Sequence, residues 1–377
     1  MNQRTRRPAP VITSWETISP FGVGRAAFRD GILAGAAPEP VPPAGDQVPG
    51  ISTRPVPDFD VRAVLGKKGT RSMNRVTGLT VATIRELLAG EPEAEESGQR
   101  RGTALVLGTT TGSAQSMMDF THTSLTGKRP YHVDPAVFPN TVMNHSAGSA
   151  AIWYGLTGPN VTVAGGRAAG VLAFNYVRRL QVSGRARTVL CGAAEEYSTA
   201  RAWLRRHSGT ADGAAADEPT VLGEGCAMLR VEAEAERGLA DVLAVRSGVF
   251  AAPEEAGRVL VASVRRALAD AEVAPGDLWA VAADGPLDAG GGAAGAALDE
   301  LLRETGARRI SCVDRIGDTA SAAGMFQVVS LLVHAESEPS DRPRIGLVTS
   351  VDRDGVAGCA VLSVRPTGGQ APTSRPA

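Results

Sequence analysis

The stretch that most constrains the fold of this chain covers residues 158–180 and reads GPNVTVAGGRAAGVLAFNYVRRL. Its β-branched run, Val161–Val163, predicts a buried strand. The pair Gly165–Gly166 follows and permits a sharp turn that other residues would find strained. From Arg167 onward apolar residues recur at helical spacing, which predicts a helix. The stretch therefore predicts a strand-to-helix elbow whose first helical residue faces a cleft.

Elbows of this kind suit a catalytic nucleophile, because the positive end of the helix lowers the pKa of a thiol placed there. This chain has Arg167 at that place. A guanidinium cannot attack a carbonyl carbon, and a cation is the unfavourable charge at a helix N-terminus. The sequence thus has the framework of a catalytic elbow without its chemistry.

The overall composition excludes several classes of function. The formal net charge is −1 over 377 residues, which gives no electrostatic reason to expect nucleic acid or a membrane surface as a partner. The four cysteines are scattered, with no Cys-x-x-Cys spacing, so we expect no metal, no redox pair and no cofactor. No signal peptide or long apolar run is present, and we expect the chain to be cytoplasmic.

Local patterns give a coarse secondary structure. Residues 38–57 are rich in Pro and Gly and predict a surface loop. Residues 56–90 end in a pattern that predicts an amphipathic helix. Alternating strands and helices over residues 103–232 predict a mainly parallel, buried sheet, and a similar rhythm follows in the second half of the chain.

Several stretches, taken in order, resemble the β-ketoacyl synthases of the thiolase superfamily. They are the elbow itself and ISPFGVGRAAFRDGILAG (18–35), VLGTTTGS (106–113), FPNTVMNHSAGSAAIWYGLTGPN (138–160) and VLGEGCAMLRVE (221–232). The resemblance implies an α/β thiolase-like fold, with two related halves in five layers α/β/α/β/α. We place the halves at residues 11–232 and 233–365, between tails 1–10 and 366–377 that we expect to be disordered.

The same resemblance identifies the positions of the family's catalytic groups, a Cys, two His and a Lys. The Cys position is Arg167. The His positions are Asp284, in VAADGPLDAG, and Asp318, in DRIGDTASAAG, and the Lys position is Val313. A late loop that is rich in Gly and Phe in the family reads SVDRDGVAG here (350–358). We therefore expect no catalytic residue in this chain.

One cation and two anions at converging positions would be costly to bury unless they satisfy one another. A guanidinium offers five donors in a planar fork, which suits carboxylates. We predict that Arg167 contacts Asp284, Asp318 or both, and that this ion cluster plugs the vestigial pocket. The alternative is that Arg167 points to solvent or reaches a partner chain.

Inactive relatives of this kind exist as the chain length factors of type II polyketide synthases, although Arg167 departs from the Gln common in them. The helix SMMDFTHTSL (116–125) resembles their gating helix. The resemblance implies that Met118, Thr121 and Leu125 form the gate of an acyl tunnel. It also implies that Ala193 lines this tunnel. Ordinary core packing is the alternative for Met118 and Leu125.

The resemblance also implies partners. We expect an obligate heterodimer with an active ketosynthase, joined through a strand made of Val161, Thr162 and Val163, and an acyl carrier protein with its phosphopantetheine-bound acyl chain. The rest of the chain resembles the partners in reducing, polyene-forming systems more than those in aromatic ones. Two other hypotheses stay open: a diverged acyltransferase or hydrolase, and a homodimeric scaffold for acyl carrier protein.

Overall fold

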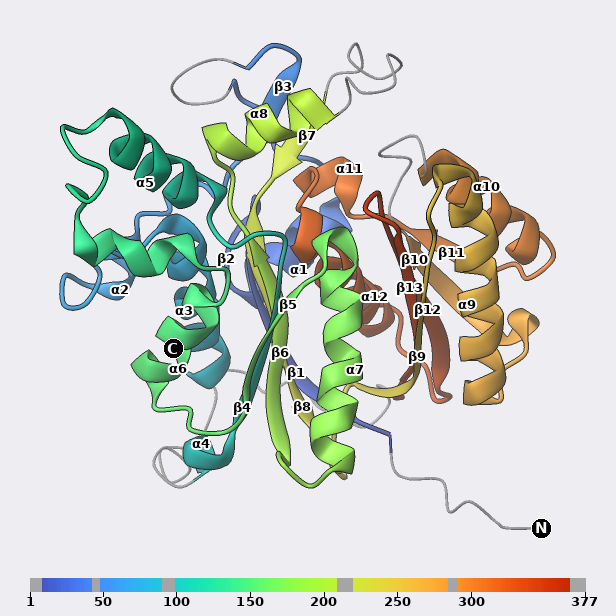
Figure 1. Ribbon diagram of the computed structural model, residues 1–377. Helices are drawn as coiled ribbons and strands as arrows, with labels where there is room; N and C mark the ends of the chain where they lie inside the picture. The colour runs from blue at the N-terminus through green and yellow to red at the C-terminus, as the bar shows by residue number, and fades with distance from the viewer. Residues whose placement is uncertain (1–8, 43–47, 90–98, 209–219, 284–290, 367–377) are drawn as a thin grey trace.

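The sheet consists of two halves with the same strand order. The computed structural model describes residues 9–42, 48–89, 99–208, 220–283 and 291–366 (Figure 1). One half runs β1-β8-β6-β4-β5 and the other β9-β13-β12-β10-β11. The strands of the first half are β1 (Val11–Ser19), β4 (Ala104–Thr109), β5 (Asn160–Ala164), β6 (Thr188–Glu195) and β8 (Gly225–Glu232). Those of the second are β9 (Ala240–Val249), β10 (Leu278–Ala283), β11 (Arg308–Ile310), β12 (Arg344–Asp352) and β13 (Val356–Val364).

Each half also repeats the same strand directions. The first two pairings of each half are antiparallel and the last two are parallel. The halves meet where β1 pairs with β9, through Val11 opposite Asp241 and Ile12 opposite Ala240. The predicted boundary at residues 232–233 falls just after β8 and before β9.

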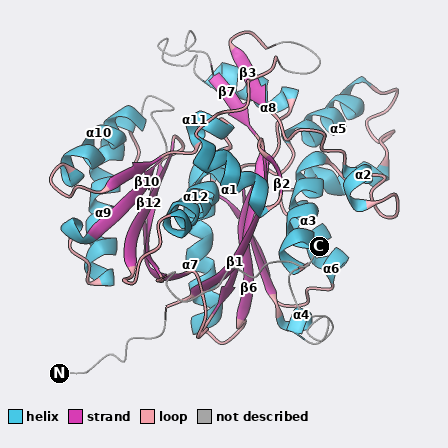
Figure 2. Ribbon diagram, turned by 180° about the vertical axis from the view of Figure 1, so that it is seen from behind, coloured by secondary structure: helices cyan, strands magenta, loops and turns pink. Residues whose placement is uncertain are grey.

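Helices separate and cover the two halves of the sheet. In Figure 1, α7 and α12 lie between the two halves, α3 and α6 lie outside the first, and α9 and α10 lie outside the second. Figure 2 shows α1 beside α12 from behind. These helices are α1 (Arg25–Ala34), α3 (Arg75–Leu88), α6 (His145–Tyr154), α7 (Ala169–Val182), α9 (Ala256–Ala271), α10 (Gly291–Leu302) and α12 (Ala323–Ser337). The arrangement confirms the predicted five-layer thiolase-like fold.

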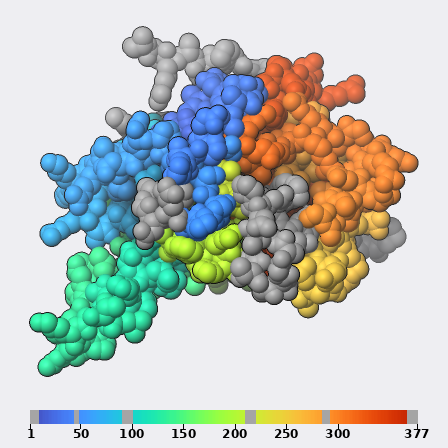
Figure 3. Space-filling model, turned by 90° about the horizontal axis from the view of Figure 1, so that it is seen from above, coloured from blue at the N-terminus to red at the C-terminus, as the bar shows by residue number. Residues whose placement is uncertain are grey.

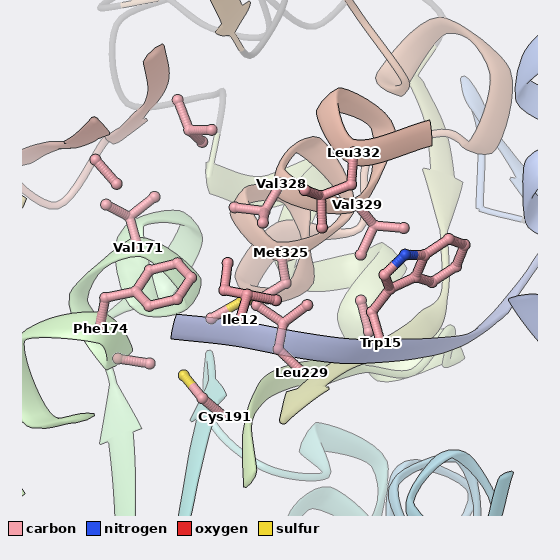
Figure 4. Packing of buried hydrophobic residues seen from close by; sticks show 14 of the residues in the cluster. Ile12, Trp15, Val171, Phe174, Cys191, Leu229, Met325, Val328, Val329 and Leu332 are labelled. Atoms are coloured by element: carbon pink, nitrogen blue, oxygen red, sulfur yellow. The ribbon is translucent and has the colours of Figure 1, made fainter. Parts of the chain in front are cut away.

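The central layer is largely apolar. Twelve of the fifteen residues of α12 are buried, which is expected for a helix packed between two sheets. Figure 4 shows Trp15 of β1, Phe174 of α7 and Met325 of α12 within one cluster. Burial of this kind contributes about 25 cal/mol per Å² of apolar surface, so the central layer is a main source of stability for the whole chain.

Shorter elements surround these layers, and several of them lie at the end of the molecule where the elbow is found. They are β2 (Gly22–Val23), β3 (Ile51–Arg54), β7 (Thr220–Gly223), α2 (Val61–Leu65), α4 (Gln99–Gly102), α5 (Ala114–Thr126), α8 (Thr199–Ser208) and α11 (Val313–Ile316), with 3₁₀ turns η2 (Pro135–Thr141), η3 (Gly166–Ala168), η4 (Pro253–Glu255), η5 (Pro275–Asp277) and η6 (Ala320–Ala322). In Figure 1, α4 lies at the opposite end and α2 lies to one side. Figure 3 shows the segment that contains α5 projecting from the rest of the molecule.

One local prediction was wrong. The segment 38–57 is not all loop, because residues 51–54 form β3, which pairs in parallel with β7. The helix predicted at the end of residues 56–90 is confirmed as α3, but it is buried on nearly all sides, from Val76 to Ile84 without a break. Its outer face packs against α6, whose presence the local pattern could not indicate. The predicted disordered tails lie mainly outside the described residues.

Candidate functional site

The predicted elbow is present and is held by glycine geometry. Strand β5 ends at Ala164, the turn follows, and η3 leads directly into the fourteen-residue helix α7. Gly166 has φ 52°, a left-handed conformation that L side chains rarely adopt. A Cβ at Gly166 would also lie 2.0 Å from a carboxylate oxygen of Asp352. The turn therefore requires glycine for two reasons, and it places Arg167 at the start of the helical segment.

Arg167 forms a buried ion pair with Asp318, which confirms this part of the predicted cluster. Its Nη2 lies 2.7 Å from Asp318 Oδ1, and the two side chains are only 10% and 7% exposed. Asp318 Oδ1 also accepts the backbone N–H of Ala320 at 2.8 Å. Asp284, the other predicted partner, lies outside the described residues. Val313, at the Lys position, is buried at the start of α11.

The electrostatics of Asp318 fit a permanently ionised carboxylate. Burial by itself raises the pKa of Asp318, but attraction to Arg167, and next to Arg201, holds that pKa at about 2, below its ordinary value of 3.8. Arg201 belongs to α8 and donates to three backbone carbonyl oxygens, those of Glu196 (3.0 Å), Gly223 (2.7 Å) and Asp318 (2.6 Å). It ties α8 to the segment that carries Asp318.

A second carboxylate contacts the elbow, and sequence analysis missed it. The backbone N–H of Arg167 donates to Asp352 Oδ2 at 2.5 Å, and Asp352 is buried at the end of β12. Ser350 Oγ, from the same strand, donates to the carbonyl oxygen of Arg167 at 3.0 Å. The signal was present in the altered loop SVDRDGVAG, where an acidic residue replaces the small and aromatic residues of the family pattern.

Around Arg167 no described cysteine or histidine offers a nucleophile or a base. All four cysteines are buried; burial raises the pKa of the Cys226 and Cys359 thiols to about 12, and also raises that of Cys191. Burial lowers the pKa of His145, which lies at the start of α6 rather than at the elbow. Over the described ranges, no group of three or more His, Cys, Asp or Glu could hold a metal ion.

The residues predicted as a tunnel gate lie on an exposed helix. Met118 and Leu125 of α5 are 53% and 80% exposed, and Thr121 is exposed as well. Core packing within this chain, the alternative explanation for Met118 and Leu125, is therefore wrong. Ala193 is fully buried in β6. It packs closely against β4, because a Cβ added to Gly108 would lie 3.0 Å from the Cβ of Ala193.

Strand β5 lies at one edge of the sheet and β11 lies at the other. β5 spans five residues without a charge, Asn160–Ala164. β11 spans three, of which Arg308 and Arg309 form ion pairs with Glu338 and Asp299. Helix α6 packs against β5 and exposes Ile152, and the segment before α6 exposes further large apolar side chains; they are Tyr131, Phe138, Val142 and Met143. Short, charged edges resist pairing with another chain, and long, uncharged ones permit it.

No helix within the described ranges is both long and apolar enough to span a bilayer.

The fold and the elbow together define a ketosynthase-like protein. The model for the β-ketoacyl synthase N-terminal domain matches residues 12–237, and the chain belongs to this family. It is similar to a chain of the ishigamide ketosynthase/chain length factor, with 39% identity and a TM-score of 0.85, over 95% of this chain and 99% of that one. The predicted family is thus confirmed.

More distant relatives agree on the fold. A β-ketoacyl synthase from Burkholderia phymatum STM815 is 19% identical with a TM-score of 0.79, over 95% of this chain and 99% of that one. A type II PKS ketosynthase in complex with its acyl-carrier protein contains a chain that is 17% identical with a TM-score of 0.77, over 95% of this chain and 100% of that one.

Curated relatives match over shorter stretches. The 3-oxoacyl-[acyl-carrier-protein] synthase 2 of Vibrio harveyi is 30% identical over 38% of this chain and 34% of its own length. The same enzyme of Synechocystis sp. (strain ATCC 27184 / PCC 6803 / Kazusa) is 27% identical over 61% and 58%. The matched part of the chain thus spans between about a third and three fifths of the length of these relatives.

Proposed function

We propose that this chain is a non-catalytic chain length factor, which pairs with an active ketosynthase to form a type II polyketide condensing enzyme. The observation that carries the proposal is the buried ion pair between Arg167 and Asp318 at the elbow. A decarboxylative condensation needs a thiolate and groups that stabilise an enolate and an oxyanion. In this chain the nucleophile position holds a cation that is already neutralised.

The surface around β5 supports pairing with a second chain. Strand β5 is uncharged, and α6, which packs against it, exposes Ile152 in the single chain. Obligate interfaces are large and apolar, resembling a domain core cut in two. Val161, Thr162 and Val163 would extend the sheet across both chains by antiparallel pairing.

The exposed face of α5 supports a role at the partner's acyl tunnel. Met118, Thr121 and Leu125 lie at spacings of three and four residues, which places them along one face of the helix. Covered by a partner chain, that face would close part of a shared cavity. The substrate would be an acyl chain on the phosphopantetheine arm of an acyl carrier protein, as the named ketosynthase complex suggests. A polyene-type product remains our prediction.

Two other functions are less well supported. A diverged acyltransferase would need a nucleophile next to a base, and no described cysteine or histidine supplies either around Arg167. A homodimeric scaffold for acyl carrier protein would use the same β5 edge, so the geometry of one chain does not separate it from the heterodimer.

The experiment is co-expression with an active ketosynthase of a type II polyketide synthase, one that retains its catalytic Cys. The expected result is a stable one-to-one complex by light scattering, with condensing activity that the ketosynthase alone lacks and that its own Cys variant abolishes. A monodisperse homodimer that does not bind the ketosynthase would favour the scaffold. A stable monomer, or acyl transfer by this chain alone, would contradict the proposal.

A further inference from the structure

The contact between Asp352 and the elbow differs in kind from the contact with Asp318. Asp318 binds the side chain of Arg167, whereas Asp352 binds its backbone N–H. Asp352 is also fixed on its other oxygen, because Oδ1 accepts the backbone N–H of Asp354 at 2.8 Å. The Oδ2 atom lies directly against the turn, where only glycine at position 166 leaves room for it. The carboxylate is thus held at both oxygens.

The backbone N–H of Arg167, which donates to Asp352, corresponds to the group that stabilises an oxyanion in enzymes with this geometry. When a nucleophile attacks a carbonyl carbon, its own backbone N–H can donate to the oxyanion that forms. The start of a helix adds a favourable field for that negative charge. In this chain the donor belongs to Arg167 at the start of η3 and α7, and a carboxylate from β12 has taken it.

We propose that Asp352 is a resident anion in the oxyanion position of this elbow, and that it closes the site independently of Arg167. Asp318 and Asp352 block the elbow through different atoms of Arg167, the guanidinium and the backbone N–H. They also come from different segments, Asp318 after α11 and Asp352 at the end of β12. A carbonyl oxygen that approached the elbow would meet a fixed carboxylate instead of a free N–H. A thiol restored at position 167 would meet a like charge, which raises its pKa.

The inference rests on the proposed function in one respect, namely that this elbow is not the catalytic site of the heterodimer. The test below measures the reactivity of a thiol in this chain only. Its result therefore does not depend on whether the chain pairs with a ketosynthase.

The test introduces a thiol as a reporter of the local charge. The parent variant carries Arg167→Cys with Asp318→Asn, so that loss of the guanidinium leaves no unpaired buried carboxylate. Asp352→Gly is then added in one variant and Asp352→Asn in a second, which keeps the size of the side chain. Asp354→Asn is the matched control, because it removes the same charge two residues away at an exposed position.

The measurement is the rate of alkylation by iodoacetamide between pH 6 and 10, followed by mass spectrometry of the peptide that contains position 167. The four native cysteines are buried, so the unmodified chain gives a low baseline. We expect Asp352→Gly to lower the thiol pKa and to raise the rate at pH 7 about tenfold over the parent, since one pKa unit changes the thiolate fraction by that factor. Asp352→Asn should act in the same direction, and Asp354→Asn should leave the profile of the parent unchanged.

Two results would overturn the proposal. One is an identical pH profile in the parent and in both Asp352 variants, with circular dichroism showing that all are folded. The other is an equal acceleration by Asp354→Asn, which would reveal a general effect of net charge. Asp352→Asn alone decides the matter if the glycine variant does not fold.

Discussion

Replacement of Arg167 by Ala should destabilise the protein through Asp318. The variant leaves a carboxylate, whose side chain is 7% exposed, without its 2.7 Å partner. Breaking a buried pair by removing one member costs on the order of 3–5 kcal/mol. The backbone N–H of Ala320 and the charge of Arg201 remain near Asp318, so we expect a loss near the lower end, about 3 kcal/mol.

The lowered pKa of Asp318 gives a magnitude for all of its stabilising contacts together, of which the attraction to Arg167 is the largest. Its fall from 3.8 to about 2 corresponds to about 2 kcal/mol of stability. Because the folded-state pKa is lowered, this contribution is fully present above pH 4 and is lost as the pH falls towards 2. Without Arg167, burial should raise the pKa of Asp318 above its ordinary value. In the variant, Asp318 should therefore take up a proton between pH 7 and pH 4. Protonation removes the buried charge, so the loss of stability should be smaller at pH 4.

The assay is urea unfolding of the purified protein, or of its complex, followed by circular dichroism at pH 7 and pH 4. Arg167→Ala should lower the free energy of unfolding more at pH 7 than at pH 4. Adding Asp318→Asn should restore part of the loss, because no unpaired charge then remains. Arg258→Ala, which removes an exposed arginine paired with Glu255, should leave the unfolding midpoint unchanged.

The reasoning would be refuted if Arg167→Ala were as stable as the unmodified protein at pH 7. A loss of equal size at both pH values would also refute it, because the penalty would then not depend on the charge of Asp318.

Three further predictions concern the partner, the tunnel and the core. Met118→Trp or Leu125→Trp should shorten the products of the assembled pair, because added volume removes space for acyl units; unchanged lengths by mass spectrometry in an intact complex would exclude the gate. Thr162→Lys should abolish co-purification with the ketosynthase by placing a charge on the β5 edge, whereas Arg309→Ala on the β11 edge should not; equal binding in both variants would exclude β5 as the interface. Burial raises the pKa of Glu196 from 4.5 to about 7, so the folded state binds a proton more tightly and this group lowers stability as the pH rises from about 5 to 8. Glu196→Gln should remove that fall in urea midpoints, and an unchanged pH dependence would contradict the raised pKa.

The sequence determined those features that depend on neighbouring residues or on the family pattern. The β-branched run, the two glycines and the apolar period specify the elbow from within twenty residues, and the structure has all three parts there. The contact between Arg167 and Asp318 could also be predicted, because the fold brings both positions to one pocket and burial requires a cation and an anion to pair.

Tertiary structure alone decided the contacts that join distant segments. Asp352 reaches the N–H of Arg167 across 185 positions of sequence, and β3 becomes a strand only because β7 lies beside it. The same holds for α3, which α6 helps to bury, and for α5, whose Met118 and Leu125 stay exposed in the single chain. Local patterns report the preference of a segment for helix or strand, whereas burial and hydrogen-bond partners depend on what the rest of the chain places against it.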